Sequence, residues 1–210
     1  MNNKYYHHYN FYNIEKEENF DASTLTILKN FKTFQQTTEE TCGPVCALMV
    51  LTYLKDKDVD GFTEISLAKS IGTKKYPIGT KLKNLVDFFK SLGRYEVVSS
   101  IDYRRKNGLC FPEFEDFKSF ILENLKQGNP IIVENIDYGG HYRVIIGYDN
   151  LSSSGDEDIL IFADPYDDTD GLRDGYNYFP ASRFYYMWFD DHCLEDEYKK
   201  QAFIVIKNKA

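Results

Sequence analysis

The most restrictive feature of this sequence is a change of pattern along the chain. Apolar residues recur at helical spacing in four segments, residues 42–54, 64–71, 80–92 and 115–127. Short runs rich in β-branched residues then follow, at residues 130–134, 141–148, 158–163 and 202–206. Helices followed by an antiparallel sheet predict an α+β domain, with a helical N-terminal half and an antiparallel sheet in the C-terminal half.

Proline, threonine and glycine residues mark the expected helix ends. Pro44 suits the first turn of the first helix, where a missing N–H removes no hydrogen bond. Thr80 is the expected N-cap of the third helix, and Gly93 is its expected C-terminal stop. Residues 1–22 are predicted to be an N-terminal extension, and residues 23–210 a single domain.

Charge and hydropathy limit the partners and the compartment. The formal net charge is −8, so the chain is not expected to bind nucleic acid or an anionic membrane surface, both of which would repel it. The first twenty residues lack the apolar core of a secretory signal, and no apolar run is long enough to span a membrane. We therefore expect a cytoplasmic protein with reduced thiols.

A cysteine opens the first apolar helix in the segment Gln36-Thr-Thr-Glu-Glu-Thr-Cys42-Gly-Pro-Val-Cys46. A helix N-terminus favours a thiolate through its dipole, and its unpaired N–H groups can donate to an oxyanion. Gly43 leaves room for a substrate backbone to approach. The alternative for Cys42 is a buried core cysteine, the usual role of a lone cysteine. The Cys-Gly-Pro sequence at the start of a helix favours a nucleophile.

One histidine stands apart from the other three. His141 opens an apolar strand directly after Gly139 and Gly140, whereas His7, His8 and His192 lie in polar segments. Glycines beside a strand indicate close backbone approach. His141 is therefore the candidate base, and a core histidine is the alternative.

The position of Asp164 follows from the hairpin that the strand after His141 is expected to form with the next strand. If Tyr148 pairs near Asp158, His141 falls near Asp164 or Pro165, so the imidazole and the carboxylate lie at the same rim of the sheet. The Asp164 carboxylate would then orient the imidazole toward Cys42. Taken alone, Asp164 would be read as a turn carboxylate before a proline.

Gln36 lies six residues before Cys42, where its side-chain amide could supply a second donor to an oxyanion. Gln35 is adjacent to it, and spacing alone does not choose between an oxyanion donor and a surface glutamine. Gln36 remains a candidate on these grounds.

Together these motifs resemble a known family over residues 34–206. They are Gln36, Thr41-Cys42-Gly43-Pro44-Val45-Cys46, Gly140-His141-Tyr142 and Ala163-Asp164-Pro165. The pattern is similar to that of the stand-alone relatives of the bacterial bacteriocin leader-processing (double-glycine) cysteine peptidases, which have a papain-like fold. The resemblance implies that Cys42 is the nucleophile, His141 the base, Asp164 its orienting group and Gln36 an oxyanion-hole donor.

Two departures from that family affect the expected substrate. Thr41 stands where the leader peptidases usually carry an aspartate. No ATP-binding cassette or membrane segment follows, so we do not expect a peptidase-exporter. The expected substrate is therefore a peptide or protein, which need not carry a double-glycine leader.

The leading hypothesis is a cysteine hydrolase that cleaves a peptide or isopeptide bond through a thioester, without a cofactor. One alternative is an acyltransferase with the same triad, and another is a non-catalytic peptide-binding module. Cys42 and Cys46 lie four residues apart, but no CxxC pair accompanies them and no metal is expected. The acidic residues Asp167, Asp168, Asp170 and Asp174 are expected in a solvated loop bordering the cleft, with a weak calcium site as the alternative.

Overall fold

The fold is described here from a computed structural model. It covers residues 23–75, 78–103, 108–152, 154–168, 173–192, 194 and 198–209. The predicted extension, residues 1–22, lies outside the described residues. Within the part of the chain that is covered, no helix is long and apolar enough to cross a membrane.

Helices and strands alternate more than the sequence pattern predicted. The helices are α2 (Cys42–Tyr53), α3 (Glu64–Ile71), α4 (Leu82–Ser91), α5 (Phe114–Lys126) and α6 (Ala181–Met187), with short 3-10 turns η1 (Val59–Gly61) and η2 (Asp137–Gly139). The strands are β1 (Leu25–Ile27), β2 (Tyr95–Ser99), β3 (Ile131–Asn135), β4 (His141–Asp149), β5 (Ile159–Ala163), β6 (Tyr176–Pro180) and β7 (Ala202–Asn208).

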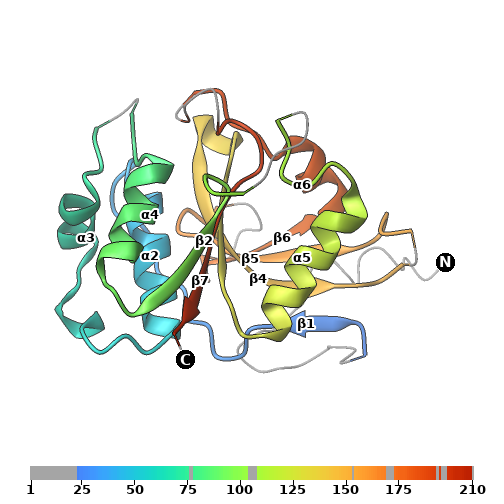
Figure 1. Cartoon of the computed structure of the whole chain (residues 1–210), viewed down its shortest axis with the longest axis horizontal. Coiled ribbons are helices and arrows are strands. Elements are labelled where there is room, and N and C mark those ends of the chain that lie inside the picture. The colour runs from blue at the N-terminus through green and yellow to red at the C-terminus, as the bar shows by residue number, and fades with distance from the viewer. Residues whose placement is uncertain are drawn as a thin grey trace.

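The strands form one antiparallel sheet in the order β2-β7-β3-β4-β5-β6, and β1 pairs with β4. Figure 1 shows α2, α3 and α4 grouped on the left and α5 and α6 on the right, with β2 and β7 between the two groups and β4, β5 and β6 extending behind α5. The sheet therefore separates two helical layers, and β4 lies between β3 and β5 near its centre.

The predicted α+β class is confirmed, and the four predicted helices correspond to α2, α3, α4 and α5. The division into two halves needs a correction, because β1 and β2 come from the first half and join the sheet, and α6 comes from the second. β1 has only three residues, which is too short for a periodic signal. β2 becomes a strand through pairing with the distant β7.

The helix that begins at Cys42 is a core helix. Nine of its residues are buried around its circumference: Cys42, Gly43, Pro44, Val45, Cys46, Ala47, Met49, Val50 and Leu51. A helix that is apolar all round is stable only when other elements surround it. The start of α2 is consequently held by packing on several sides.

The strands β3, β4 and β5 are buried on both faces, since every residue in each is buried. Helices on both sides of the sheet explain why these strands read as continuous apolar runs instead of alternating ones. The same burial fixes the register, because a slip by one residue would turn each side chain to the opposite face.

The β4–β5 hairpin differs in detail from the predicted register. In the ladder Tyr148 pairs with Leu160, although its hydroxyl still donates to Asp158 at 2.7 Å, and the register shifts between Ile145 and Gly147. The shift is a bulge in β4, and it moves the far end of the hairpin by one position. The start of β4 and the end of β5 still meet at the same rim of the sheet.

Candidate active site

Cys42 is the first residue of α2, and its side chain is almost buried, with 7% exposed. The helix starts here because the N–H of Val45 bonds to the carbonyl of Thr41 at 2.9 Å and Pro44 needs no N–H partner. A Cβ on Gly43 would lie 3.0 Å from two carbons of the Thr80 side chain. Glycine therefore allows the segment before α4 to pack closely beside the cysteine.

Thr80 does not cap α4 as the sequence predicted. The N-cap is Lys81, and the Thr80 hydroxyl lies 2.8 Å from that of Thr73. Thr80 is 3% exposed and lines the same pocket as Cys42. Thr80 therefore forms part of the pocket wall. The sequence pattern of a helix cap gives no indication of this position.

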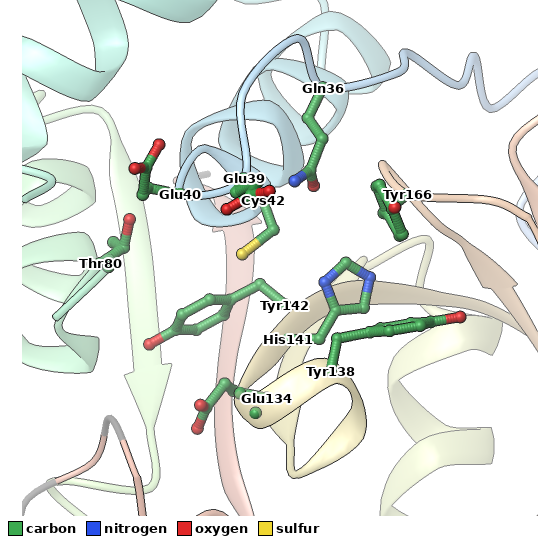
Figure 2. A pocket seen from close by; sticks show the side chains of 13 residues that line it. Gln36, Glu39, Glu40, Cys42, Thr80, Glu134, Tyr138, His141, Tyr142 and Tyr166 are labelled. Atoms are coloured by element: carbon green, nitrogen blue, oxygen red, sulfur yellow. The ribbon is translucent and has the colours of Figure 1, made fainter. Parts of the chain in front are cut away.

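His141 is the first residue of β4, and Asp164 directly follows β5. His141 is 3% exposed, and its Nε2 lies 2.6 Å from Oδ1 of Asp164. The other ring nitrogen, Nδ1, is left for Cys42, whose side chain forms a hydrogen bond with His141. Figure 2 shows the imidazole and the thiol facing each other in the pocket. The structure therefore brings Cys42, His141 and Asp164 together.

The charge state of His141 is set by these two neighbours. Burial alone would lower its pKa, but the charge and hydrogen bond of Asp164 and the hydrogen bond with Cys42 raise the pKa to about 9. An imidazole with this pKa holds its proton at neutral pH. A protonated imidazole beside a thiol favours the thiolate form.

Asp164 is kept ionised although it is only 1% exposed. Burial would raise its pKa, but the charge and hydrogen bond of His141 and the charge of Arg143 hold the pKa below its ordinary value. Its Oδ1 also accepts the backbone N–H of Tyr166 at 2.9 Å. A fixed, ionised carboxylate is what orients and charges an imidazole.

Arg143 is a residue of the site that the sequence analysis missed. It is 2% exposed, and its Nη1 lies 3.9 Å from Oδ2 of Asp164. Its Nη2 donates to Asn135 at 2.9 Å and to Asp137 at 2.5 Å, and its guanidinium lies over the Phe162 ring. The sequence did contain a signal for Arg143. Residues two apart on a strand share a face, and Arg143 is two residues after His141.

The two neighbouring glutamines lie on different sides of the site. Gln36 lines the pocket, and its Nε2 donates to the carbonyl of Thr38 at 2.8 Å. Gln35 bonds instead to the segment after β5, donating to the carbonyl of Asp164 at 3.1 Å and accepting the N–H of Asp167 at 3.3 Å. An amide nitrogen carries two hydrogens, so Gln36 can donate a second bond into the pocket.

Glu64, the first residue of α3, holds the loop between Gln36 and Cys42. Its carboxylate accepts the backbone N–H and the hydroxyl of Thr37, both at 2.8 Å, and also the hydroxyl of Thr41. Glu64 was not predicted from the sequence, because its contact depends on how α3 packs against α2. These bonds fix the loop that precedes the cysteine.

The pocket has a volume of about 250 Å³ and is lined by carboxylates and tyrosines around the thiol and imidazole. Tyr138 and Tyr166 lie on the His141 side, as Figure 2 shows. Glu40 and Thr80 lie on the opposite side of Cys42 in the same view. The pocket thus has two ends of different chemistry on either side of the thiol.

The prediction of a solvated acidic loop is partly wrong. Asp167 is 2% exposed, and its Oδ2 accepts the N–H of Gly175 at 2.9 Å, so it is a structural residue. Asp168 accepts the hydroxyl of Tyr138 at 2.7 Å. Asp170 lies outside the described residues. Among those that are described, no cluster of three or more histidine, cysteine or acidic residues could hold a metal.

Cys46 and Cys110 are both buried free thiols. Cys46 is fully buried, and its Sγ lies 3.3 Å from the carbonyl oxygen of Tyr142. Burial raises the pKa of the Cys46 thiol well above its ordinary value, so this thiol stays protonated. Its role is packing in the core.

Comparison with known proteins gives a family and two similar structures. The model of the Peptidase_C39 like family matches residues 28–192. A crystal structure of a double glycine motif protease from an AMS/PCAT transporter, in complex with the leader peptide, is 16% identical, with 85% of this chain and 91% of that chain covered and a TM-score of 0.49. The peptidase domain of Streptococcus ComA, a bi-functional ABC transporter involved in a quorum sensing pathway, is 18% identical, with 85% and 99% covered and a TM-score of 0.49. The search of curated proteins found no match.

The family assignment rests on the sequence match and not on these two structural similarities. The matched segment contains Gln36, Cys42, His141 and Asp164. It spans most of the chain, from the residue after β1 to the region beyond α6. The chain belongs to the Peptidase_C39 like family.

Proposed function

We propose that this protein is a cysteine peptidase that cleaves a peptide or isopeptide bond through Cys42, His141, Asp164 and Gln36. Family membership supports the general activity. The observation that carries the residue assignment is the buried His141–Asp164 pair beside a thiol at a helix N-terminus. A nucleophile, a base and a carboxylate that orients the base are the three groups of a catalytic triad for covalent acyl transfer.

In the resting pair the shared proton is on the imidazole of His141, and in the first step the Cys42 sulfur, as the thiolate, attacks the carbonyl carbon of the substrate. The carbonyl oxygen becomes an oxyanion. The backbone N–H groups of Cys42 and Gly43, at the very start of α2, have no partner within the helix and can bind it, together with Nε2 of Gln36. Both donors are fixed before the reaction, because Glu64 holds the loop that joins Gln36 to Cys42.

Collapse of the oxyanion breaks the C–N bond, and His141 gives its proton to the leaving nitrogen. The acyl group is then a thioester on Cys42. In the second step His141 takes a proton from water, and the hydroxide attacks the thioester and releases the acid. Asp164 stabilises the imidazolium in both steps and remains ionised throughout.

The test is cleavage of a mixed peptide library by wild type and Cys42→Ala, with products identified by mass spectrometry. Cys110→Ala is the matched control, because Cys110 and Cys42 are both 7% exposed. Wild type and Cys110→Ala should give the same new termini, and Cys42→Ala should give none. Cleavage by Cys42→Ala would refute the assignment.

The acyltransferase alternative is separated by the products. Hydrolysis of a peptide leaves a free carboxylate, whereas transfer leaves an amide to the added amine. Product analysis with and without a primary amine therefore distinguishes the two reactions. If Cys42→Ala binds peptides as wild type does and neither cleaves them, the non-catalytic binding module is the correct alternative.

A further inference from the structure

The position of the general acid fixes which end of the pocket receives the leaving group. His141 must give its proton to the leaving nitrogen, so that nitrogen has to lie within hydrogen-bond reach of the imidazole. The residue that follows the cleaved bond therefore lies against the side chains around His141. The acyl part lies toward the opposite end, where Figure 2 shows Glu40 and Thr80.

Two exposed tyrosines occupy the leaving-group end. Tyr138 and Tyr166 both line the pocket and are 57% and 44% exposed. Their ring centroids are 5.3 Å apart, and they lie 5.5 Å and 6.5 Å from that of His141. The three rings are nearly perpendicular to one another, which leaves aromatic surface open beside the imidazole.

The backbone at Tyr138 is held in an unfavourable conformation. Its φ of 57° lies in the left-handed region, and Gly139 and Gly140 follow with φ of 80° and 111°. Such a conformation in a residue other than glycine persists only where the surroundings impose it, and it is frequent at functional sites. Burial does not account for it, because the side chain is mostly exposed.

Two fixed contacts impose this conformation. Asp137 is bound to the buried Arg143, which anchors the chain immediately before Tyr138. The Tyr138 hydroxyl donates at 2.7 Å to Asp168, which lies two residues after Tyr166 in the segment that follows β5. The polar end of Tyr138 is thus satisfied, and its ring is held beside His141 with its apolar surface exposed.

We propose that Tyr138 and Tyr166 bind the residue that follows the cleaved bond, and that they select an aromatic side chain at this position. This inference rests on the proposed function. Aromatic side chains gain both burial and edge-to-face contacts against such rings. A glycine at the same position would leave the two rings uncovered and would bind less well.

Competition between two amines for an acyl-enzyme tests this selection without a known peptide substrate. p-Nitrophenyl acetate acetylates Cys42 and releases p-nitrophenolate. Phenylalaninamide and glycinamide at equal concentration then compete for the thioester. The amine nitrogen forms the new amide bond, the C–S bond breaks, and the amine proton passes through His141 to the sulfur. The two N-acetyl amides are quantified by mass spectrometry.

The wild type should favour the phenylalanine product, and Tyr138→Ala and Tyr166→Ala should each lower the product ratio by about tenfold, the discrimination expected of a small apolar contact. Tyr138→Phe keeps the ring but loses the hydroxyl bond to Asp168, so its ratio should lie between those of wild type and Tyr138→Ala. Tyr186→Ala is the matched control, because Tyr186 is 76% exposed on α6 and does not line the pocket.

The outcomes separate this inference from the proposed function. If Cys42 is acetylated but the ratio is the same in wild type and Tyr138→Ala, the inference is wrong and the proposed nucleophile stands. If no acetyl group forms on Cys42 of the wild type, the proposed function is wrong and the inference with it. An equal loss of selectivity in Tyr186→Ala would also overturn the inference, because the effect would not be local.

Discussion

Nε2 of His141 lies 2.6 Å from Oδ1 of Asp164, although the two residues are 23 positions apart in the sequence. Both are at the rim of the sheet where β4 begins and β5 ends. The pair is buried, and it raises the pKa of the imidazole to about 9. Because a buried carboxylate charges the imidazole, the stability of the fold depends on the protonation of His141, and so would the activity proposed for Cys42.

Stability should therefore fall as the pH rises through the alkaline range. The folded pKa of His141 is about 9 and its ordinary value is 6.5, so its contribution is complete below about pH 6.5 and is lost as the pH rises to about 9. The loss should be on the order of 3 kcal/mol, since one pH unit corresponds to about 1.4 kcal/mol. Urea unfolding of wild type and His141→Gln at pH 6 and pH 10, both chosen to bracket this range, measures it. A constant difference between the two proteins would contradict the assignment.

Gln36→Ala should lower kcat/KM for p-nitrophenyl acetate by about 10²- to 10³-fold, because it removes an oxyanion donor. Gln35→Ala is the matched control. Its side chain bonds to the segment after β5, so its loss should lower the free energy of unfolding by about 1 kcal/mol and keep most of the activity. Equal losses of kcat/KM in the two variants would mean that Gln36 has no special role.

Arg143→Met should lower the free energy of unfolding by about 3 kcal/mol, because it leaves Asp137 and Asp164 without their buried cation. Adding Asp137→Asn should recover part of this loss, because it removes one of the two carboxylates. Arg183→Met is the control, since Arg183 is exposed and lies over the Phe179 ring at 5.3 Å. Chemical denaturation of the four proteins measures these differences, and a similar small loss in both single variants would disprove the role of Arg143.

The Tyr138→Gly variant should be more stable than the Tyr138→Ala variant, although alanine is usually the more stabilising of the two residues. Tyr138→Ala and Tyr138→Gly lose the same side-chain contacts, but only glycine adopts a φ of 57° without strain. We expect Tyr138→Gly to unfold with a free energy about 1 kcal/mol higher than Tyr138→Ala. If thermal or urea unfolding shows that Tyr138→Ala is more stable than Tyr138→Gly, the backbone at this position is not strained.

The parts of the fold that could be predicted were those with local signals. The apolar helix after Cys42 and the β-branched strands β3, β4, β5 and β7 have patterns of their own. β1 and β2 could not be predicted in the same way, because each is a strand through pairing with a distant segment. Thr80 was wrongly predicted to be a helix cap. Its hydroxyl instead contacts that of Thr73, and no local sequence pattern indicates this contact.

The proximity of His141 and Asp164 could be predicted although the register was wrong. A hairpin of these two strands places both residues at one rim of the sheet. The bulge in β4 changes which residues pair along the hairpin, but β4 still begins and β5 still ends at that rim. Arg143 and Glu64 were missed for different physical reasons. Alternation along β4 would have placed Arg143 beside His141, whereas Glu64 reaches Thr41 only through the packing of helices.

Mapped alkylation with iodoacetamide at neutral pH tests the central claim, that His141 activates Cys42, most directly. Cys42 and Cys110 are both 7% exposed, so a difference in their rates reports activation and not access. We predict that Cys42 is alkylated at least about tenfold faster than Cys110, and that His141→Ala removes this advantage. Equal rates at Cys42 and Cys110 in the wild type would contradict the claim.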